Sequence, residues 1–211
     1  MNRLIRFAFQ QFYTTFAWTY DVVAFIVSFG EWKAWGRIAL AFVPDGARVL
    51  EIAHGPGHLH VTMRQRGMNV VSIDRSWQMA RMLQANARRT SHQPAQQARA
   101  DAHQLPFGDG AFDCVISTFP AEFIFADATL REIYRVLNPG GSLIIVPSTS
   151  FRGNGWVIRL VQVAYRITGQ SQINIAPVRA KFESNHFAFA QQIIQTQRTE
   201  VVVWVCTKRR A

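Results

Sequence analysis

The sequence predicts an α/β fold in which a mainly parallel sheet of seven strands has helices on both faces and an antiparallel last strand. Short apolar runs alternate with helical segments through the middle of the chain, which is typical of a parallel sheet with crossover helices. A glycine turn, His54 to Gly57, joins the first of these runs to a helix. Two further alternating runs, 187–194 and 200–208, are joined by so short a segment that they can pair only in the antiparallel sense.

The order of apolar, helical and turn segments places each element along the chain. The strands expected before the C-terminal pair are Arg48–Ala53, Asn69–Asp74, Gln96–Ala100, Phe112–Thr118 and Ser142–Ser148. Helices are expected at Gly57–Arg66, Trp77–Arg88 and Asp127–Leu137. The last of these should end at the Asn-Pro-Gly-Gly sequence of residues 138–141, because proline cannot continue a helix and glycine tolerates the turn.

The turn after the first strand is the most informative part of the chain. Residues Val49 to Gly57 read V-L-E-I-A-H-G-P-G, an apolar strand with an acid and then a glycine turn that opens a helix. Glycines let the backbone pass close to a ligand, and the helix that follows presents free N–H groups. Asp74 ends the second strand, and its sequence separation from the glycine turn suits a carboxylate that binds ribose hydroxyls. The pattern favours a nucleotide-like cofactor, although Asp74 and Ser76 could simply cap the helix that begins near Trp77.

Three further segments complete a resemblance to class I S-adenosylmethionine-dependent methyltransferases. They are A-D-A-H-Q-L-P-F-G-D-G-A-F from Ala100, F-D-C-V-I-S-T-F from Phe112, and L-R-E-I-Y-R-V-L-N-P-G-G-S-L-I-I-V from Leu130. The chain is most similar to the methyltransferase type 11 branch, which includes ubiquinone and menaquinone biosynthesis methyltransferases. The order and spacing of the blocks over about 49–146 are more specific than any single block. The resemblance implies a Rossmann-like fold and S-adenosyl-L-methionine as the cofactor.

The resemblance also implies which residues bind that cofactor. Glu51 is expected near its amino end, Asp74 at the ribose and Thr118 at the methionine side, with an Asp-Ala pair facing the adenine. The full set is Glu51, Ala53, His54, Gly55, Gly57, Asp74, Arg75, Asp101, Ala102 and Thr118.

The implied reaction is an in-line methyl transfer from a sulfonium to an oxygen, nitrogen or carbon nucleophile of a lipophilic small molecule. A quinone, lipid or pigment precursor fits this description. Positioning and exclusion of water should contribute more than an acid or base. If the nucleophile must lose a proton, the candidate bases are Tyr20, His54, His103, Glu122 and His186. Tyr20 and Glu122 are preferred, because the family's comparable segments border the cofactor.

Composition indicates one domain placed inside the cell. The chain has 211 residues, of which 49% are hydrophobic and 17% charged, so it can bury a large core with a weakly charged surface. No apolar run is long enough for a transmembrane helix, and the start does not resemble a cleaved signal. Cys114 and Cys206 are expected to be buried thiols, and the histidines at 54, 58 and 60 lack the partners of a metal site.

Charge and aromatic residues are unevenly distributed over four expected parts of the domain. The N-terminal helical arm, 1–42, holds 12 of the 26 aromatic residues, and the cofactor-binding core, 43–150, has ten basic and nine acidic residues. An inserted amphipathic helix, 151–175, and a C-terminal helix with a β-hairpin, 176–211, together hold nine basic and two acidic residues. A basic amphipathic helix can lie on an anionic membrane, which would make the protein peripheral on the cytoplasmic face. Alternatively, the arm and the inserted helix simply cover the sheet and the pocket.

Two other functions are compatible with the sequence. Ala53 stands where the family commonly has Gly; we expect it to weaken cofactor binding at most, but it also suits an inactive, peripheral subunit of a membrane protein complex. An RNA substrate is the lesser alternative, because the basic charge could neutralise phosphates. The S-T-F-P sequence after the fourth strand differs from the N-P-P-Y pattern usual in enzymes that methylate base amino groups, which makes nucleic acid an unlikely partner.

Overall fold

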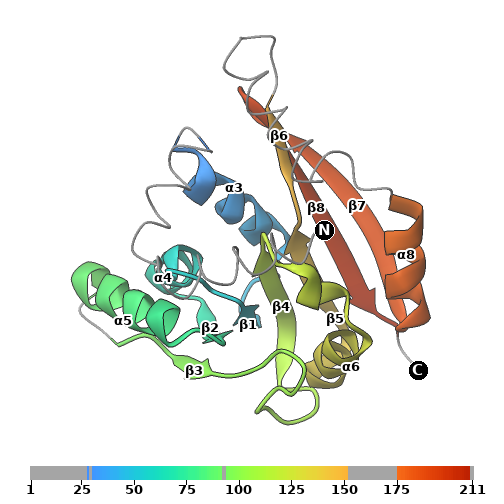
Figure 1. The fold of residues 1–211 in the computed structure, drawn as a ribbon, viewed down its shortest axis with the longest axis horizontal. Coiled ribbons are helices and arrows are strands. Elements are labelled where there is room, and N and C mark those ends of the chain that lie inside the picture. The colour runs from blue at the N-terminus through green and yellow to red at the C-terminus, as the bar shows by residue number, and fades with distance from the viewer. Residues whose placement is uncertain (1–27, 29, 92–93, 152–174, 210–211) are drawn as a thin grey trace, which may run out of the picture.

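A mixed sheet runs through the whole molecule, as the sequence predicts. The computed structural model describes residues 28, 30–91, 94–151 and 175–209 (Figure 1). The strands are β1 (Arg48–Ile52), β2 (Asn69–Asp74), β3 (Gln97–Arg99), β4 (Phe112–Thr118), β5 (Leu137–Val146), β6 (Thr149–Phe151), β7 (Phe187–Gln195) and β8 (Thr199–Lys208). The inserted helix, apart from its two end positions, and the arm up to residue 27 lie outside the described residues.

The strand order is β3-β2-β1-β4-β5-β8-β6, and β7 pairs with the free side of β8. The first five strands are parallel, whereas β8 is antiparallel to β5, β6 and β7. The predicted mainly parallel sheet with a reversed last strand is therefore confirmed. The sheet has eight strands instead of seven, because the short β6 continues along β8 beyond the end of β5.

Helices cover both faces of this sheet. They are α3 (Trp32–Ile38), α4 (His58–Gln65), α5 (Trp77–Ser91), α6 (Asp127–Val136) and α8 (Ile175–Ser184), with short 3-10 turns η2 (Ala39–Phe42) and η3 (Glu122–Phe125). One core cluster joins the sheet to α3 and α4, and a second joins its other face to α6 and α8. Helix α5 lies beside α4 at the β3 end of the sheet (Figure 1).

The Asn-Pro-Gly-Gly segment ends α6 as predicted, but β5 begins before it. Phe112 pairs with Leu137 and Cys114 with Ser142, so residues 138–141 bulge opposite Asp113 alone. The Asn138 side chain donates to the carboxylate of Asp113, and a Cβ on Gly141 would lie 3.0 Å from the Asp113 carbonyl oxygen. The tight bulge therefore needs glycine, and the strand starts earlier than the turn sequence suggests.

The C-terminal hairpin is also confirmed, with β7 and β8 paired along their whole length. Cys114 and Cys206 are both free and buried, and burial raises the pKa of the Cys114 thiol to about 12. In the described part of the chain, no helix is long and apolar enough to span a bilayer.

Candidate cofactor-binding site

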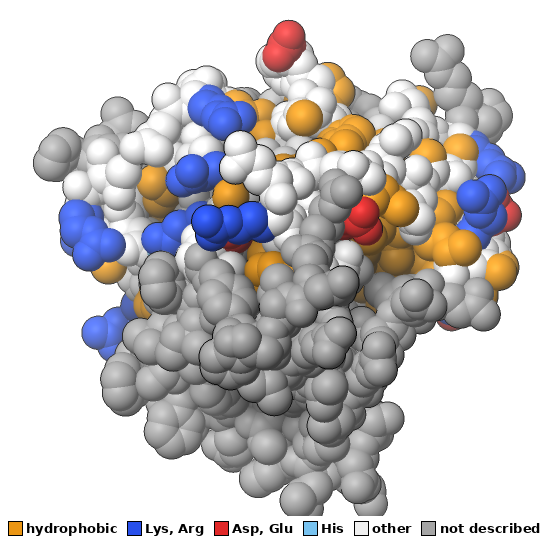
Figure 2. Space-filling view, turned by 90° about the horizontal axis from the view of Figure 1, so that it is seen from above, with side chains coloured by type: hydrophobic (Ala, Val, Ile, Leu, Met, Phe, Trp, Pro, Cys, Tyr) orange, Lys and Arg blue, Asp and Glu red, His pale blue; other side chains and the backbone are white. Residues whose placement is uncertain are grey.

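The candidate site lies where the chain direction of the sheet changes, between β1 and β4. From β1 the chain proceeds outward to β2 and β3, and then returns to β4 and β5 on the other side. Helices on opposite sides of such a point leave a crevice at the carboxyl ends of the strands. The glycine turn, Asp74 and Thr118 all follow or end strands at this edge. It is the upper edge in Figure 1 and faces the viewer in Figure 2.

The backbone of the turn is left-handed at three positions within five residues. The φ angles are 59° at Ala53, 53° at Gly55 and 81° at Gly57. A Cβ on Gly57 would lie 2.2 Å from Cδ1 of Leu83, so this glycine allows the start of α4 to pack against α5. A Cβ on Gly55 would meet nothing within 4 Å. Gly57 is thus explained by helix packing, whereas Gly55 borders open space in which a ligand could approach the backbone.

Asp74 ties the turn to the second strand and caps the next helix. One carboxylate oxygen accepts the Gly55 N–H at 3.0 Å, and the other accepts the Ser76 N–H at 2.8 Å. The Ser76 hydroxyl in turn accepts the Met79 N–H at 3.3 Å. Asp74 is only half-buried, and each of its oxygens can accept a second hydrogen bond. The helix-capping alternative is therefore real, and it leaves the carboxylate able to accept ribose hydroxyls.

Behind the turn, Glu51 belongs to a buried polar chain. Its side chain is 2% exposed, and Oε2 accepts the Ser72 hydroxyl at 2.7 Å. Nδ1 of His60 lies 2.6 Å from the same hydroxyl oxygen, so it donates to Ser72. Burial raises the pKa of Glu51 to about 8, with the Ser72 hydrogen bond opposing the rise. Glu51 is thus buried beneath the turn and hydrogen-bonded to Ser72 on the neighbouring strand β2.

His54 presents an acceptor without a partner at the same place. Its Nδ1 lies 2.7 Å from the Gly55 carbonyl oxygen, which fixes the proton on Nδ1 and leaves a lone pair on Nε2. Nε2 is buried and has no hydrogen-bond partner among the described residues. Burial lowers the pKa of His54, although the nearby Asp74 carboxylate opposes this. Buried polar atoms are rarely left unpaired, so a ligand with a donor group would satisfy the site.

The expected adenine-facing pair follows β3. The Asp101 carboxylate accepts the His103 N–H at 2.9 Å and also contacts the His103 ring, and these bonds lower the pKa of Asp101. The charge of Arg75 acts in the same direction, which places it near this carboxylate. Ala102 is buried in the core beside them. The structure therefore brings Asp101, Ala102 and Arg75 to the same edge of the sheet as Asp74.

An aromatic layer lies over the end of β4, on the expected methionine side. Phe119, which follows Thr118, has a left-handed φ of 50°, and its ring stacks on Trp32 of α3 with centroids 4.1 Å apart. Gly36 of α3 also approaches Thr118, since its Cβ would lie 3.9 Å from Cγ2 of that residue. This cover from α3 was not anticipated in residue detail; the aromatic density of the arm was its only signal.

The structure separates the candidate bases. Glu122 is exposed in η3, just after β4, and remains at the candidate edge. His103 is bonded to Asp101, and Tyr20 lies outside the described residues. His186 immediately precedes β7, whose first residue pairs with Lys208 at the amino edge of the parallel strands. That position is opposite the glycine turn, so His186 is wrong as a candidate base.

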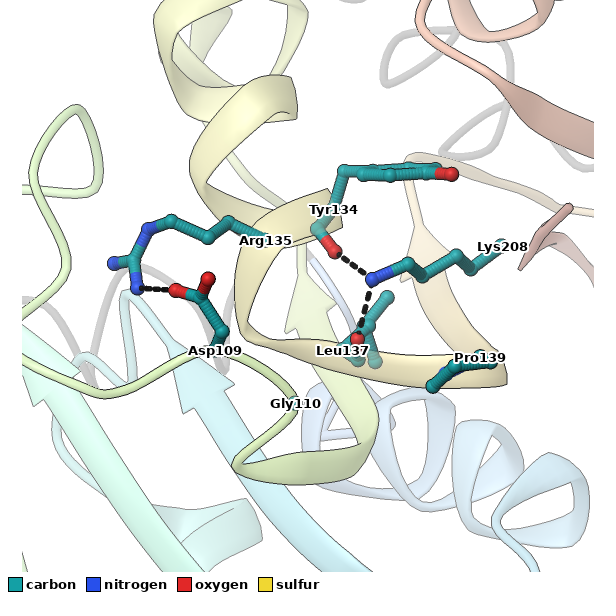
Figure 3. Close-up of a pocket in the computed structure, with 7 residues that line it drawn as sticks. All are labelled: Asp109, Gly110, Tyr134, Arg135, Leu137, Pro139 and Lys208. Carbon is teal, nitrogen blue, oxygen red and sulfur yellow. Dashed lines mark hydrogen bonds and ion pairs between the residues drawn. The ribbon is translucent and has the colours of Figure 1, made fainter. Parts of the chain in front are cut away.

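A separate cavity of about 500 Å³ opens at the amino edge and is shown in Figure 3. Lys208 reaches into it and donates to the carbonyl oxygens of Tyr134 and Leu137, both at 2.7 Å. Arg135 is paired with Asp109 at 2.8 Å. These charged groups already anchor α6 to β8 and to the preceding loop, so the charged residues that line the cavity are accounted for by a structural role.

Comparison with known proteins finds a methyltransferase domain in the middle of the chain. Residues 50–145 match the family model described as a methyltransferase domain. Demethylmenaquinone methyltransferase from Thermus thermophilus is 37% identical over 135 residues, covering 60% of each chain. The ubiquinone/menaquinone biosynthesis C-methyltransferase UbiE from Methylococcus capsulatus is 34% identical over 134 residues, covering 60% of this chain and 54% of that protein. The chain thus matches little more than half the length of these relatives.

Solved structures share the fold at low sequence identity. A SAM-dependent methyltransferase from Methanosarcina mazei superimposes with a TM-score of 0.59 at 17% identity, covering 82% of this chain and 98% of that one. The [4+2]-cyclase SpnF gives 0.62 at 17% identity, covering 85% and 81%. Geranyl diphosphate methyltransferase gives 0.62 at 13% identity, covering 83% and 77%. Residues 50–145 therefore match a methyltransferase domain, and the sheet has the fold of these solved structures.

Proposed function

We propose that this protein transfers a methyl group from S-adenosylmethionine to a lipophilic small molecule, such as a quinone, lipid or pigment precursor, at a membrane surface. The observation that carries the proposal is the match of residues 50–145 to the methyltransferase domain, since this segment contains the turn bound to Asp74. The relatives named for demethylmenaquinone and ubiquinone biosynthesis support an acceptor of this class.

The residues at the carboxyl edge suit the chemistry of this cofactor. Asp74 would accept the ribose hydroxyls, and Nε2 of His54 would accept a donor group of the ligand. Gly55 leaves the space needed for close approach, while Asp101 and Ala102 would face the adenine. When bound, the cofactor supplies an electrophilic methyl group on a sulfonium.

The chain's own contribution to the reaction would be positioning and exclusion of water. Phe119 and Trp32 form an aromatic cover beside Thr118, where the methionine part is expected. A dry, aligned site favours transfer, because the sulfonium charge disperses as the methyl group moves. If the acceptor loses a proton, Glu122 is the described candidate closest in sequence to this cover, and Tyr20 is the other preferred candidate.

Calorimetric titration with S-adenosylmethionine tests the cofactor site. The folded protein should bind it in the micromolar range, and Asp74→Asn should weaken binding by roughly tenfold or more through loss of charge-assisted hydrogen bonds. Ser76→Ala is the matched control, because it removes the helix-capping contact to Met79 but leaves the carboxylate. Equal losses in the two variants would show that Asp74 acts only as a cap.

Transfer itself is tested with cofactor carrying a deuterated methyl group. Lipid and quinone extracts incubated with active protein should contain a product heavier by the labelled methyl group, as measured by mass spectrometry. A protein that binds the cofactor but labels nothing would contradict the proposed class of acceptor.

A second candidate is a catalytically inactive subunit of a membrane complex. Ala53 motivates it, because the family commonly has Gly at this position and the additional methyl group would reduce the space for the ligand. A correctly folded protein that shows no binding in the titration would favour this candidate over the enzyme.

A further inference from the structure

Basic and acidic residues are unevenly distributed within the nearly neutral cofactor-binding core, 43–150. Residues 52–100 contain seven arginines, no lysine and only one acid, whereas residues 101–150 contain two arginines and six acids. The first segment builds the outer half of the sheet, with β2, β3, α4 and α5. Seen from the carboxyl edge in Figure 2, most of the basic side chains lie on one half of the surface, whereas the other half is more hydrophobic and carries a smaller basic group at its far end.

Trp77 protrudes from the basic half at this edge. It is the first residue of α5, and 60% of it is exposed, which makes it one of two exposed large hydrophobic residues in the described part of the chain. An exposed indole is costly to hydrate, and its amphipathic ring suits the boundary between water and lipid headgroups. Trp77 therefore has the properties of a surface anchor.

Three exposed arginines surround this residue in sequence and structure. Arg81 follows Trp77 by one helical turn, and Arg75 precedes it in the loop after Asp74. Nε of Arg99 donates to the Arg75 carbonyl oxygen at 3.0 Å, which holds the end of β3 against that loop. Helix α5 contains no acid.

The acids nearest to these arginines in sequence already have other partners. Asp74 accepts the backbone N–H groups of Gly55 and Ser76, and Asp101 is bonded to His103. Asp101 lies near enough to Arg75 to offset part of its charge, but three guanidinium groups against these two carboxylates leave the face around the indole with a net positive charge. That charge and the apolar ring together complement an anionic bilayer.

We propose that Trp77, Arg75, Arg81 and Arg99 form the face by which this protein docks on an anionic lipid bilayer. The indole enters the headgroup layer, and the guanidinium groups bind lipid phosphates. The inference rests on the proposed function, because a lipophilic acceptor resides in the bilayer. The face lies at the carboxyl ends of β2 and β3, so docking places the cofactor edge of the sheet near the membrane.

The arrangement favours lipid over nucleic acid. Firm binding of a nucleic-acid backbone takes a track of several phosphate contacts. The remaining arginines of this half, at 64, 66, 88 and 89, lie toward the opposite ends of α4 and α5 instead of extending the face around Trp77. The compact group with a protruding aromatic tip matches insertion into an interface.

Vesicle co-sedimentation tests the proposal with the full chain and without cofactor. Vesicles of equal parts phosphatidylcholine and phosphatidylglycerol should bind the protein, and pure phosphatidylcholine should bind it much less. Arg75→Gln with Arg81→Gln should reduce partitioning by roughly 10-fold or more, and Trp77→Ser should reduce it several-fold. Far-UV circular dichroism verifies that each variant is folded.

The control is Arg88→Gln with Arg89→Gln, which removes the same amount of charge from the far end of α5, about 16 Å from Trp77. It should retain most of the binding. An equal loss in the control would overturn the proposal, as would binding that depends only on Arg159 and Arg166 of the expected inserted helix, 151–175. The proposal would also be overturned if the arginine and Trp77 variants no longer bound a duplex RNA but still bound the vesicles. Failure here leaves the titration and labelling tests of methyl transfer unaffected, since neither needs vesicles.

Discussion

Glu51 should make the protein less stable as the pH rises, and Glu51→Gln should remove this trend. The carboxyl group is 2% exposed on β1, with a pKa of about 8 against an ordinary value of 4.5. Between these values the folded protein holds a proton that the unfolded chain has lost. The folded state thus binds more protons than the unfolded state, so the free energy of unfolding falls with increasing pH. The contribution is fully present below about pH 4.5 and is lost as pH rises toward 8.

The magnitude follows from the size of the pKa difference. Each pKa unit corresponds to about 1.4 kcal/mol, so ionising Glu51 in the folded state costs about 5 kcal/mol in full and about 3 kcal/mol at pH 7. Glutamine is an uncharged substitute whose carbonyl oxygen can accept the Ser72 hydroxyl. Its extra N–H groups are expected to cost roughly 1–3 kcal/mol at every pH if they find no partner. The informative quantity is therefore how the difference in free energy of unfolding between the variant and the wild type changes with pH.

Urea unfolding of both proteins from pH 5 to pH 7 measures this change. The variant should gain about 2 kcal/mol relative to the wild type across that range. His60, whose pKa burial lowers to about 4, titrates in the opposite sense but is present in both proteins. Glu122→Gln is the control, because that acid is exposed and its removal should change stability little. A difference that stays constant with pH would refute the assignment of a proton to Glu51.

Three substitutions test the glycine turn. Gly57→Ala should destabilise the protein by about 3 kcal/mol or more in thermal or urea unfolding, because the added methyl group would clash with Leu83 and the φ angle is left-handed. Gly55→Ala should cost only about 1 kcal/mol, because its methyl group would contact no other atom within 4 Å. Ala53→Gly should stabilise the protein by up to about 1 kcal/mol and leave cofactor affinity equal or higher, since it removes a left-handed side chain; weaker binding in calorimetry would contradict this.

Local sequence signals predicted the central strands well. The bounds expected for β2 and β4 are those observed, because each apolar run is closed by a polar or turn residue that also ends the pairing. The start of β5 was wrong, since the bulge at residues 138–141 lets pairing resume on both sides of a turn sequence. Turn chemistry shows where the chain bends, but the register depends on the neighbouring strand.

Long-range contacts explain most of what the sequence could not supply at the site. Gly57 is a member of the expected motif, yet its need for glycine comes from Leu83 on another helix. Trp32 meets Phe119 only because α3 folds over the end of β4. The enclosure of Glu51 likewise depends on Ser72 and His60 from two other elements. A single chain's sequence reveals residue types at a strand end, whereas their partners follow from the assembled sheet.

The strained positions bear on the choice between an enzyme and an inactive subunit. Ala53 and Phe119 are both left-handed residues that follow neighbouring strands, β1 and β4, and each such residue costs on the order of 1–3 kcal/mol. Backbone strain of this kind tends to occur where a ligand site over-determines the local geometry. Membrane docking through Trp77 and α5 would not require Ala53 or Phe119 to be left-handed. The two positions thus support a turn shaped for a ligand, while the cyclase of the same fold shows that methyl transfer must be established from the acceptor.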